Sequence, residues 1–358
     1  MTESGQPKTA KISSILSVSH EKDVDGLCAS AIVARYAESK GMDFDVILTD
    51  YGTMDVVFKK IGSRKNSIIV ITDLGLDENI LPQVTSGLKR AISQGCKIVW
   101  LDHHNWATRS MKAIVSLPNK PILRVNPDFC AAEIAFKTLM PRDEVCAELA
   151  RIAHDTDFNL REVEAATALA DALAVLRFAA IASKDDMTEA LRPLLTSIAN
   201  GGLEEVWDDD AKRLKDDLLE KQVRNYRKER LKKMKRALKD HCDQKVHERL
   251  IRIVQIPLGI TTTDIGTFMA EETNLAVEGR QLARADLMIT LTQGGMLGFR
   301  RGSESVLCDM AAKLFKGGGH PYAAGGEYGP WEIFQAVCDD IFLTLTENRT
   351  WLNDAQES

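Results

Sequence analysis

The sequence predicts an α/β protein: an N-terminal doubly wound, mainly parallel sheet, joined by a long helical linker to a smaller α+β domain. Three observations lead to this prediction. The chain has 358 residues, which is enough for two domains. Its first 130 residues alternate apolar strand-like runs with helical patterns, as in a parallel sheet covered on both faces. A long charged helical pattern then separates them from a second set of strands and helices.

The composition narrows the class of protein. Hydrophobic residues make up 44% and charged residues 27%, which is usual for globular proteins and excludes a disordered or fibrous chain. The formal charge of -6 argues against a protein that coats nucleic acid through overall positive charge, so a phosphate-binding site must be local. The seven cysteines form no C-x-x-C pair, which argues against a disulfide framework or a structural zinc site.

The apolar stretches indicate a soluble protein of the cytoplasm with no membrane partner. The first ten residues contain no apolar leader segment. The most apolar later stretch, residues 169–182, is interrupted by Asp171 and Arg177.

The elements of the first predicted domain, residues 1–202, follow in order. Four apolar runs rich in β-branched residues predict strands, and each ends in polar residues: 12–20, 44–50, 67–74 and 97–104. Helical patterns connect these runs, and further helical patterns occupy residues 131–140, 143–155, 161–180 and 187–200. The pair Gly201 and Gly202 marks the end of this domain.

Residues 203–245 predict a helical linker, and residues 246–358 predict the smaller domain. Within the linker, residues 221–239 contain ten Lys or Arg against one acid, Glu229. This basic stripe is either a solvated helix face or a surface that binds a polyanion. The last domain combines strand-like runs at 249–257, 285–292 and 296–301 with helical patterns and a glycine-rich loop at 317–326.

Polar clusters follow directly after three of the predicted strands. The clusters are His20, Asp23 and Asp25, then Asp73, then Asp102, His103 and His104. Taken alone, the first cluster is weak evidence, because Asp is a common helix N-cap. However, parallel sheets bind ligands at the carboxyl ends of their strands. A buried Asp at each strand end is costly unless it is paired or binds a metal.

The chemistry of these side chains predicts a metal centre. Carboxylate and imidazole ligands without thiolate favour Mn²⁺ or Mg²⁺ over structural zinc or an iron–sulfur cluster. So many carboxylates in one place would repel one another unless cations neutralised them. We therefore expect two divalent cations roughly 4 Å apart, an arrangement that catalyses the hydrolysis of phosphate esters. A fourth candidate segment, residues 154–157 with the sequence HDTD, follows a helical run.

A glycine-rich loop near the C-terminus predicts a phosphate-binding element. It contains Gly317, Gly318, Gly319 and His320. Glycines let backbone N–H groups approach a phosphate closely, although such a loop can also be only a tight turn. Arg300, on the preceding strand-like run, supplies the planar guanidinium suited to phosphate.

With these motifs, HEKDVDG, ITD, LDHH, HDTD and GGGH, the chain resembles the DHH phosphoesterase superfamily with its C-terminal DHH-associated domain. The resemblance spans nearly all of the chain and is nearest to RecJ-like nucleases, nano-RNases and compact archaeal exonucleases. It implies two Mn²⁺ ions, with Mg²⁺ or Co²⁺ as substitutes. The implied metal ligands are His20, Asp23, Asp25, Asp73, Asp102, His103 and Asp155, with Asp155 favoured over Asp157 by the family pattern. Direct coordination by His20 stays open, because its spacing from Asp23 differs from that in some members.

The resemblance further implies that Asp102, His103 and His104 are catalytic, and that Arg300 and the loop Gly317–His320 bind substrate. The function it implies is a Mn²⁺-dependent exonuclease that hydrolyses single-stranded DNA or RNA, or short oligonucleotides, to nucleoside monophosphates, with a 3'-to-5' direction in some relatives. The alternative enzyme is a phosphatase or phosphodiesterase of nucleoside bisphosphates or cyclic dinucleotides. A non-catalytic replication scaffold is the third reading. The implied partners are nucleic acid, a helicase or another replication or repair protein, and further copies of the chain.

Overall fold

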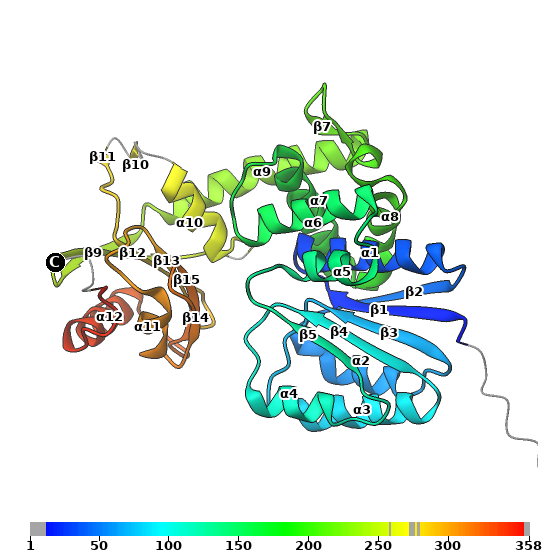
Figure 1. The fold of residues 1–358 in the computed structure, drawn as a ribbon. Helices are drawn as coiled ribbons and strands as arrows, with labels where there is room; N and C mark the ends of the chain where they lie inside the picture. Colours follow the sequence, from blue (N-terminus) through cyan, green and yellow to red (C-terminus); the bar gives the residue numbers. More distant parts are fainter. Residues whose placement is uncertain (1–11, 258, 272–275, 278–279, 354–358) are drawn as a thin grey trace, which may run out of the picture. The chain divides into compact units, whose positions relative to one another are not determined.

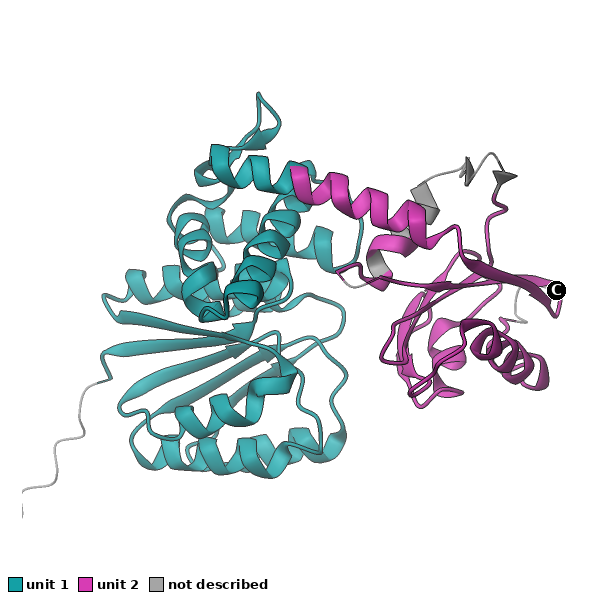
Figure 2. Ribbon diagram, turned by 180° about the vertical axis from the view of Figure 1, so that it is seen from behind, with its two compact units in different colours: residues 1–224 teal, residues 225–358 magenta. Residues whose placement is uncertain are grey.

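The computed structural model describes residues 12–257, 259–271, 276–277 and 280–353. It divides into two compact units, Met1–Arg224 and Asn225–Ser358 (Figure 2). The boundary falls inside the helix α9 (Asp217–Ala237), and therefore inside the predicted linker. The predicted fold class, a parallel α/β sheet followed by a separate smaller α+β unit, is confirmed.

The first unit is built on a five-stranded sheet in the order β2-β1-β3-β4-β5, in which all paired neighbours are parallel (Figure 1). Buried β-branched residues such as Ile15, Val70 and Ile71 fill both of its faces. The strands are β1 (Ser14–His20), β2 (Asp43–Thr49), β3 (Ser67–Thr72), β4 (Lys97–Asp102) and β5 (Ile122–Val125).

Helices cover both faces of this sheet and bury two separate cores. One core contains Phe58 and Trp100, and lies under α2 (Met54–Ile61), α3 (Leu81–Ser93) and α4 (Thr108–Val115). The other contains Ile15 and Leu101, and lies under α1 (Val24–Ser39), α5 (Ala131–Leu139), α6 (Glu144–Asp157), α7 (Glu164–Ser183) and α8 (Met187–Gly201). Because the strands are parallel, their carboxyl ends lie at the same edge of the sheet, and this edge positions the site.

Helix α7 has the length and apolar composition of a membrane-spanning segment. In this structure Ala166, Leu169 and Leu173 pack in the core of the first unit, as in a core helix of a globular domain. The first ten residues, whose lack of an apolar leader is part of the sequence prediction, lie outside the described residues.

Strand β2 lies at the edge of the sheet, and side chains cap part of its outer backbone. The N–H of Val46 donates to the Asp45 carboxylate at 2.9 Å, and the N–H of Leu48 donates to the hydroxyl of Thr188 at 3.0 Å. After α8 the first unit continues with η2 (Gly202–Glu205) and a short hairpin of β6 (Trp207–Asp208) and β7 (Arg213–Leu214).

The second unit contains a mixed six-stranded sheet in the order β14-β15-β13-β12-β9-β8. Only β9 and β12 pair in parallel within it. The strands are β8 (His241–Val246), β9 (Arg249–Gln255), β12 (Leu287–Leu291), β13 (Met296–Arg301), β14 (Gly318–His320) and β15 (Ala323–Glu327). Two further short strands are β10 (Ala276–Val277) and β11 (Arg280–Gln281).

Helices also cover this sheet. Residues of α11 (Cys308–Lys313) and α12 (Phe334–Glu347) pack with Phe299 in one core. Met234 near the end of α9, and Leu238 directly after this helix, pack with α10 (Thr262–Glu271) in another. The glycine-rich loop predicted from the sequence is the β14–β15 hairpin of this sheet.

Candidate metal centre

The first part of the site is the turn between β1 and α1. His20 is the last residue of β1, and Asp23 is the N-cap of α1, where its carboxylate accepts from the Gly26 N–H at 3.0 Å. A Cβ atom at Gly26 would lie 2.2 Å from the His20 carbonyl oxygen, so only glycine allows this tight turn. The turn brings the Asp23 carboxylate to 2.8 Å from Nδ1 of His20.

Asp25, in the first turn of α1, is held by the start of another helix. Its two carboxylate oxygens accept from the backbone N–H groups of Ala131 and Ala132, both at 2.7 Å. These are the first two residues of α5, whose helix dipole favours a negative charge. The side chain is buried, and Oδ2 lies 3.7 Å from Nε2 of His103.

Asp73 occupies the position directly after β3 and joins the clusters of the neighbouring strands. Its backbone φ is 54°, in the left-handed region that a non-glycine residue adopts at a cost. Its carboxylate lies 3.1 Å from Nε2 of His103 and 3.5 Å from Nδ1 of His20. Because β1, β3 and β4 are neighbours in the sheet, their carboxyl ends meet around this one side chain.

Three groups of ligand atoms result, and within each group the atoms lie within 4.8 Å of one another. All use only carboxylate oxygens and imidazole nitrogens. Asp73 belongs to two groups and His103 to two, so the groups adjoin one another. They are His20–Asp23–Asp73, Asp73–His103–His104 and Asp25–His103–Asp157.

The electrostatics of this cluster show strong repulsion between carboxylates. Burial and the neighbouring Asp73 and Asp157 carboxylates raise the pKa of Asp25 well above its usual range. Burial and the Asp23 carboxylate do the same to the pKa of Asp73. Burial alone would lower the pKa of His20, but its contacts with Asp23 and Asp73 outweigh that effect and raise the pKa to about 11. Positive charge is therefore strongly favoured here.

Two atoms of the cluster are buried without a hydrogen-bond partner, namely Nε2 of His20 and Oδ2 of Asp73. Buried polar atoms are rarely left in this way, so each orphan needs an explanation. A cation would provide one, and the mixture of oxygen and imidazole ligands suits Mn²⁺ or Mg²⁺. The residues therefore fit a divalent metal centre, and His20, whose role the sequence leaves open, has an atom available for it.

Asp102, which the sequence predicts as a metal ligand, is the last residue of β4 and lies beside His104. Oδ1 accepts from Nδ1 of His104 at 2.9 Å, and Oδ2 accepts from Nε1 of Trp106 at 2.5 Å. Although burial acts in the opposite direction, these hydrogen bonds keep the pKa of Asp102 below its usual value. None of the groups found among the described residues includes Asp102. Its carboxylate orients the ring of His104.

In the fourth segment, the sequence prediction favours Asp155 over Asp157 as the metal ligand. The structure places Oδ2 of Asp157 at 3.5 Å from Nδ1 of His103. The Asp155 carboxylate accepts from the Glu162 backbone N–H at 2.7 Å, and Asp155 is absent from the groups formed by the described residues. Both residues lie in the last turn of α6, so the difference depends on which way each side chain points.

Sequence reasoning missed two residues at the end of β2. Oδ1 of Asp50 lies 3.5 Å from Nε2 of His20, and its other oxygen pairs with Lys22 at 2.6 Å. The signal was available, because Asp50 directly follows an apolar strand, as Asp73 does. The adjacent Tyr51 stacks edge-on against His20, with ring centroids 5.4 Å apart. Burial raises the pKa of the Tyr51 hydroxyl.

The predicted substrate-binding residues lie in the second unit. His320 pairs with Ala323 across the β14–β15 hairpin, and Ala323 pairs with Arg300 of β13. Residues in register share one face of a sheet, so Arg300 and His320 flank the small Ala323. The rings of His320 and Tyr322 are nearly parallel, with centroids 5.2 Å apart.

The glycines of this hairpin differ in their surroundings. A Cβ at Gly317 would lie 2.0 Å from the Gly325 carbonyl oxygen, and Gly319 has a φ of 146°, so the hairpin needs both glycines. A Cβ at Gly318 would meet no atom within 4 Å. Gly318 therefore leaves open space beside the backbone, which is available to a ligand.

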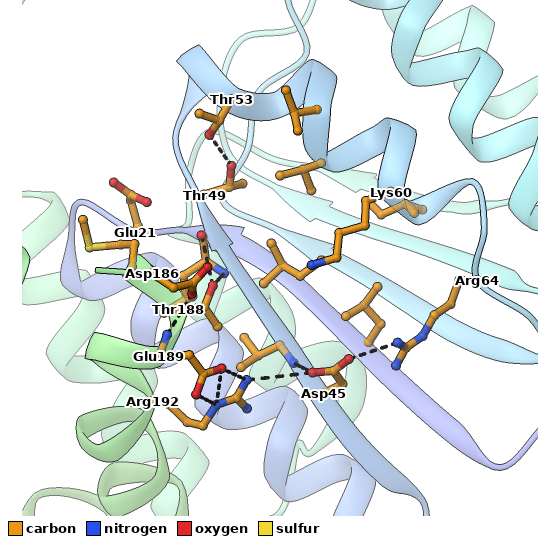
Figure 3. Close-up of a pocket in the computed structure, with 18 of the residues that line it drawn as sticks. Glu21, Asp45, Thr49, Thr53, Lys60, Arg64, Asp186, Thr188, Glu189 and Arg192 are labelled. Atoms are coloured by element: carbon orange, nitrogen blue, oxygen red, sulfur yellow. Dashed lines mark hydrogen bonds and ion pairs between the residues drawn. The ribbon is translucent and has the colours of Figure 1, made fainter. Parts of the chain in front are cut away.

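A groove of about 800 Å³ runs along the outer edge of β2, between α2 and α8 (Figure 3). None of the grouped metal-centre residues lines it. Its charged side chains are largely paired with one another: Asp45 lies between Arg64 and Arg192, at 3.0 and 3.9 Å, and Arg192 also binds Glu189. We therefore assign the chemistry to the cluster of acids and histidines and not to this groove.

Comparison with known families agrees with this assignment. Residues 14–175 match the family described as "DHH family, N-terminal domain". This range contains every member of the three groups. No curated protein sequence matches the chain.

Solved structures share the fold across nearly the whole chain. An exopolyphosphatase-related protein from Bacteroides fragilis aligns with 94% of this chain and 93% of its own, with 15% identity and a TM-score of 0.53. RecJ from Thermus thermophilus, in complex with Mn²⁺, aligns with 95% of this chain, with 17% identity and a TM-score of 0.55. The present chain covers 53% of that RecJ chain, so it spans about half its length. At these identities the likeness is one of fold.

Proposed function

We propose that this chain, whose residues 14–175 match the DHH family, is a metal-dependent phosphoesterase and acts as a Mn²⁺-dependent exonuclease or oligonucleotidase. Its substrate would be single-stranded DNA or RNA, or short oligonucleotides, and its products nucleoside monophosphates. The observation that carries this proposal is the pair of adjoining groups, His20–Asp23–Asp73 and Asp25–His103–Asp157, on the carboxyl edge of one parallel sheet.

The geometry of these residues suggests which of them would hold each metal ion. Asp23 and Asp73, with His20, would hold one divalent ion, and Asp25, Asp157 and His103 the other. When bound, such ions neutralise a phosphate and lower the pKa of a water molecule for in-line attack. Asp102, through its hydrogen bond, fixes the ring of His104 so that the imidazole can contact the scissile phosphate. The manganese complex of T. thermophilus RecJ, which has the same fold, makes Mn²⁺ the first ion to test.

The exposed lysines of helix α9 favour a polymeric substrate. Lys228, Lys232 and Lys235 are exposed and follow one another at helical spacing along about 10 Å of the helix. Lys232, Lys235, Arg236 and Lys239 line a hollow of about 530 Å³ in the second unit, together with Asp240. A row of cations can follow a phosphodiester backbone without reading its sequence.

Turnover of different substrates tests the proposal. Single-stranded DNA and RNA, labelled at either end in turn, should give ladders shortened from one end in the presence of Mn²⁺. Preference for a nucleoside bisphosphate or a cyclic dinucleotide over both strands and dinucleotides would instead establish the small-molecule alternative. The absence of hydrolysis of every phosphodiester offered would reject the enzyme itself.

A charge variant tests the role of α9. The triple variant Lys228→Gln, Lys232→Gln, Lys235→Gln should raise the KM for a long strand about 10-fold and leave dinucleotide turnover within about twofold, because each phosphate contact adds to affinity. The control removes three exposed lysines elsewhere, Lys65, Lys89 and Lys97, by the same substitution. An equal loss for long and short substrates, or no loss, would contradict the role of α9.

A further inference from the structure

Tyr51 connects three loops at the carboxyl edge of the first sheet. It follows β2, and its hydroxyl accepts from the backbone N–H of Gly75, after β3, at 3.2 Å. The same hydroxyl lies 3.3 Å from Nε2 of His104, after β4. Its ring contacts those of His20 and His104 edge-on, with centroids 5.4 and 6.1 Å away.

These contacts hold the imidazole of His104 from both sides. The buried Asp102 carboxylate binds Nδ1 at 2.9 Å, and the Tyr51 hydroxyl lies next to Nε2. A tyrosine hydroxyl can both donate and accept, so this contact is available whether or not His104 carries a second proton. The ring plane is therefore fixed by two groups from different strands.

The turn after β3 leaves little freedom for this arrangement. A Cβ at Gly75 would lie 3.0 Å from Cβ of His104 and 3.6 Å from the Tyr51 hydroxyl oxygen. The glycine thus lets the backbone approach both residues. Tyr51 itself is 39% exposed, so the edge of the cluster beside it is open to a ligand.

We propose that Tyr51 is a positioning residue for the reaction: its hydroxyl and the Asp102 carboxylate together fix the His104 ring, and the Nε2–H group is shared between that hydroxyl and the scissile phosphate. This inference rests on the proposed function for its effect on rate. Positioning groups beyond the first contacts of a metal site typically change activity by about 10- to 100-fold, which sets the expected scale.

Tyr51→Phe keeps the ring and removes only the hydroxyl. We expect kcat to fall about 10-fold, with KM and Mn²⁺ affinity each within about twofold of the wild type. Tyr36→Phe, which removes a hydroxyl from a half-buried tyrosine on α1, is the matched control and should leave all three quantities unchanged. A loss of Mn²⁺ affinity equal to the loss of rate would show that Tyr51 only supports the metal residues, and would overturn the proposal.

A double-mutant cycle tests whether Tyr51 acts through His104. His104→Gln should lower kcat about 100-fold, and adding Tyr51→Phe to it should lower kcat no further, because the hydroxyl then has nothing to position. Independent, multiplying effects would overturn the proposal.

The orientation itself can be measured without activity. A crystal structure of the Tyr51→Phe variant should show the His104 ring in more than one rotamer, whereas the Tyr36→Phe variant should show one. A single, unchanged rotamer in Tyr51→Phe would reject the inference. If the wild type hydrolyses no phosphodiester, the proposed function fails, but this structural test still decides the role of Tyr51.

Discussion

Both units bury charged side chains, but they treat them in opposite ways. In the second unit, Arg252 is 1% exposed and gives two hydrogen bonds to Asp243, at 2.7 and 2.5 Å. In the first unit, Asp25 and Asp73 are equally buried, yet their neighbours include other carboxylates that raise their pKa. The charge of Arg252 is matched by that of Asp243. The cluster around Asp25 and Asp73 is left with an excess of negative charge.

This difference separates a structural ion pair from a site prepared for a ligand. A buried charge with a well-matched partner contributes to a defined fold. A buried cluster with orphaned atoms, such as Oδ2 of Asp73, is costly in the protein alone and is retained where a ligand repays that cost. The contrast predicts that substitutions in the two regions will have opposite effects on stability and on metal binding.

The largest effect is expected at Asp73, which joins the two groups it belongs to. Asp73→Asn should lower phosphodiester hydrolysis more than about 100-fold and weaken Mn²⁺ binding, because a carboxylate ligand of one of the two ions is lost. The metal-free protein should melt at the same temperature or higher, because the variant removes a repelled charge and asparagine tolerates the left-handed backbone. Activity assays, calorimetric Mn²⁺ titration and thermal unfolding measure these effects.

Asp143→Asn is the matched control for this carboxylate. Asp143 caps α6 and pairs with Arg35 at 2.8 Å, away from the grouped residues. The Asp143→Asn variant should therefore have the same Mn²⁺ affinity as the wild type. If Asp73→Asn retained normal Mn²⁺ binding, the comparison between the units would lose its basis.

A smaller effect should distinguish two acids on one helix turn. Asp157→Asn should weaken Mn²⁺ binding about 10- to 100-fold, because its carboxylate lies beside His103. Asp155→Asn should change Mn²⁺ affinity by less than about threefold but lower the melting temperature, because the Glu162 N–H loses a charged acceptor. The opposite ranking of the two affinities would restore Asp155 as the ligand.

The smallest effect is expected in the second unit. Arg252→Met should lower the free energy of unfolding by about 2 kcal/mol, less than the roughly 3–5 kcal/mol typical of breaking a fully buried pair, since Asp243 is partly exposed and can be hydrated. Mn²⁺ affinity should not change. Denaturant unfolding and Mn²⁺ titration of this variant measure the two effects. A variant that is as stable as the wild type but binds Mn²⁺ poorly would contradict the comparison between the two units.

Much of the fold could be predicted, because the parallel sheet has strong sequence signals. The strands that lead to His20, Asp73 and Asp102 are rich in Ile, Val and Leu, and polar residues mark their carboxyl ends. The unit boundary inside α9 could not be predicted, because one continuous helical pattern covers both halves. Val223 packs in the first unit and Met234 in the second, which only tertiary contacts reveal.

The residue types of the site were also predictable, but their individual roles were not. The rule about strand ends places Asp102 near the centre, and the resemblance to the family places Asp155 there. They do not show that Trp106 and His104 take up both oxygens of Asp102, or that Glu162 binds Asp155. Those partners depend on side-chain direction in three dimensions. Asp50 follows the same strand-end rule and could have been included.

The capped edge of β2 has a consequence for how copies of this chain can assemble. An unpaired outer strand invites a strand from another molecule, and proteins block such pairing with charged or bonded side chains. Here the Asp45 carboxylate and the Thr188 hydroxyl already occupy N–H groups that an incoming backbone would need. If copies of this chain assemble, the outer edge of β2 should therefore not be the place where their sheets pair.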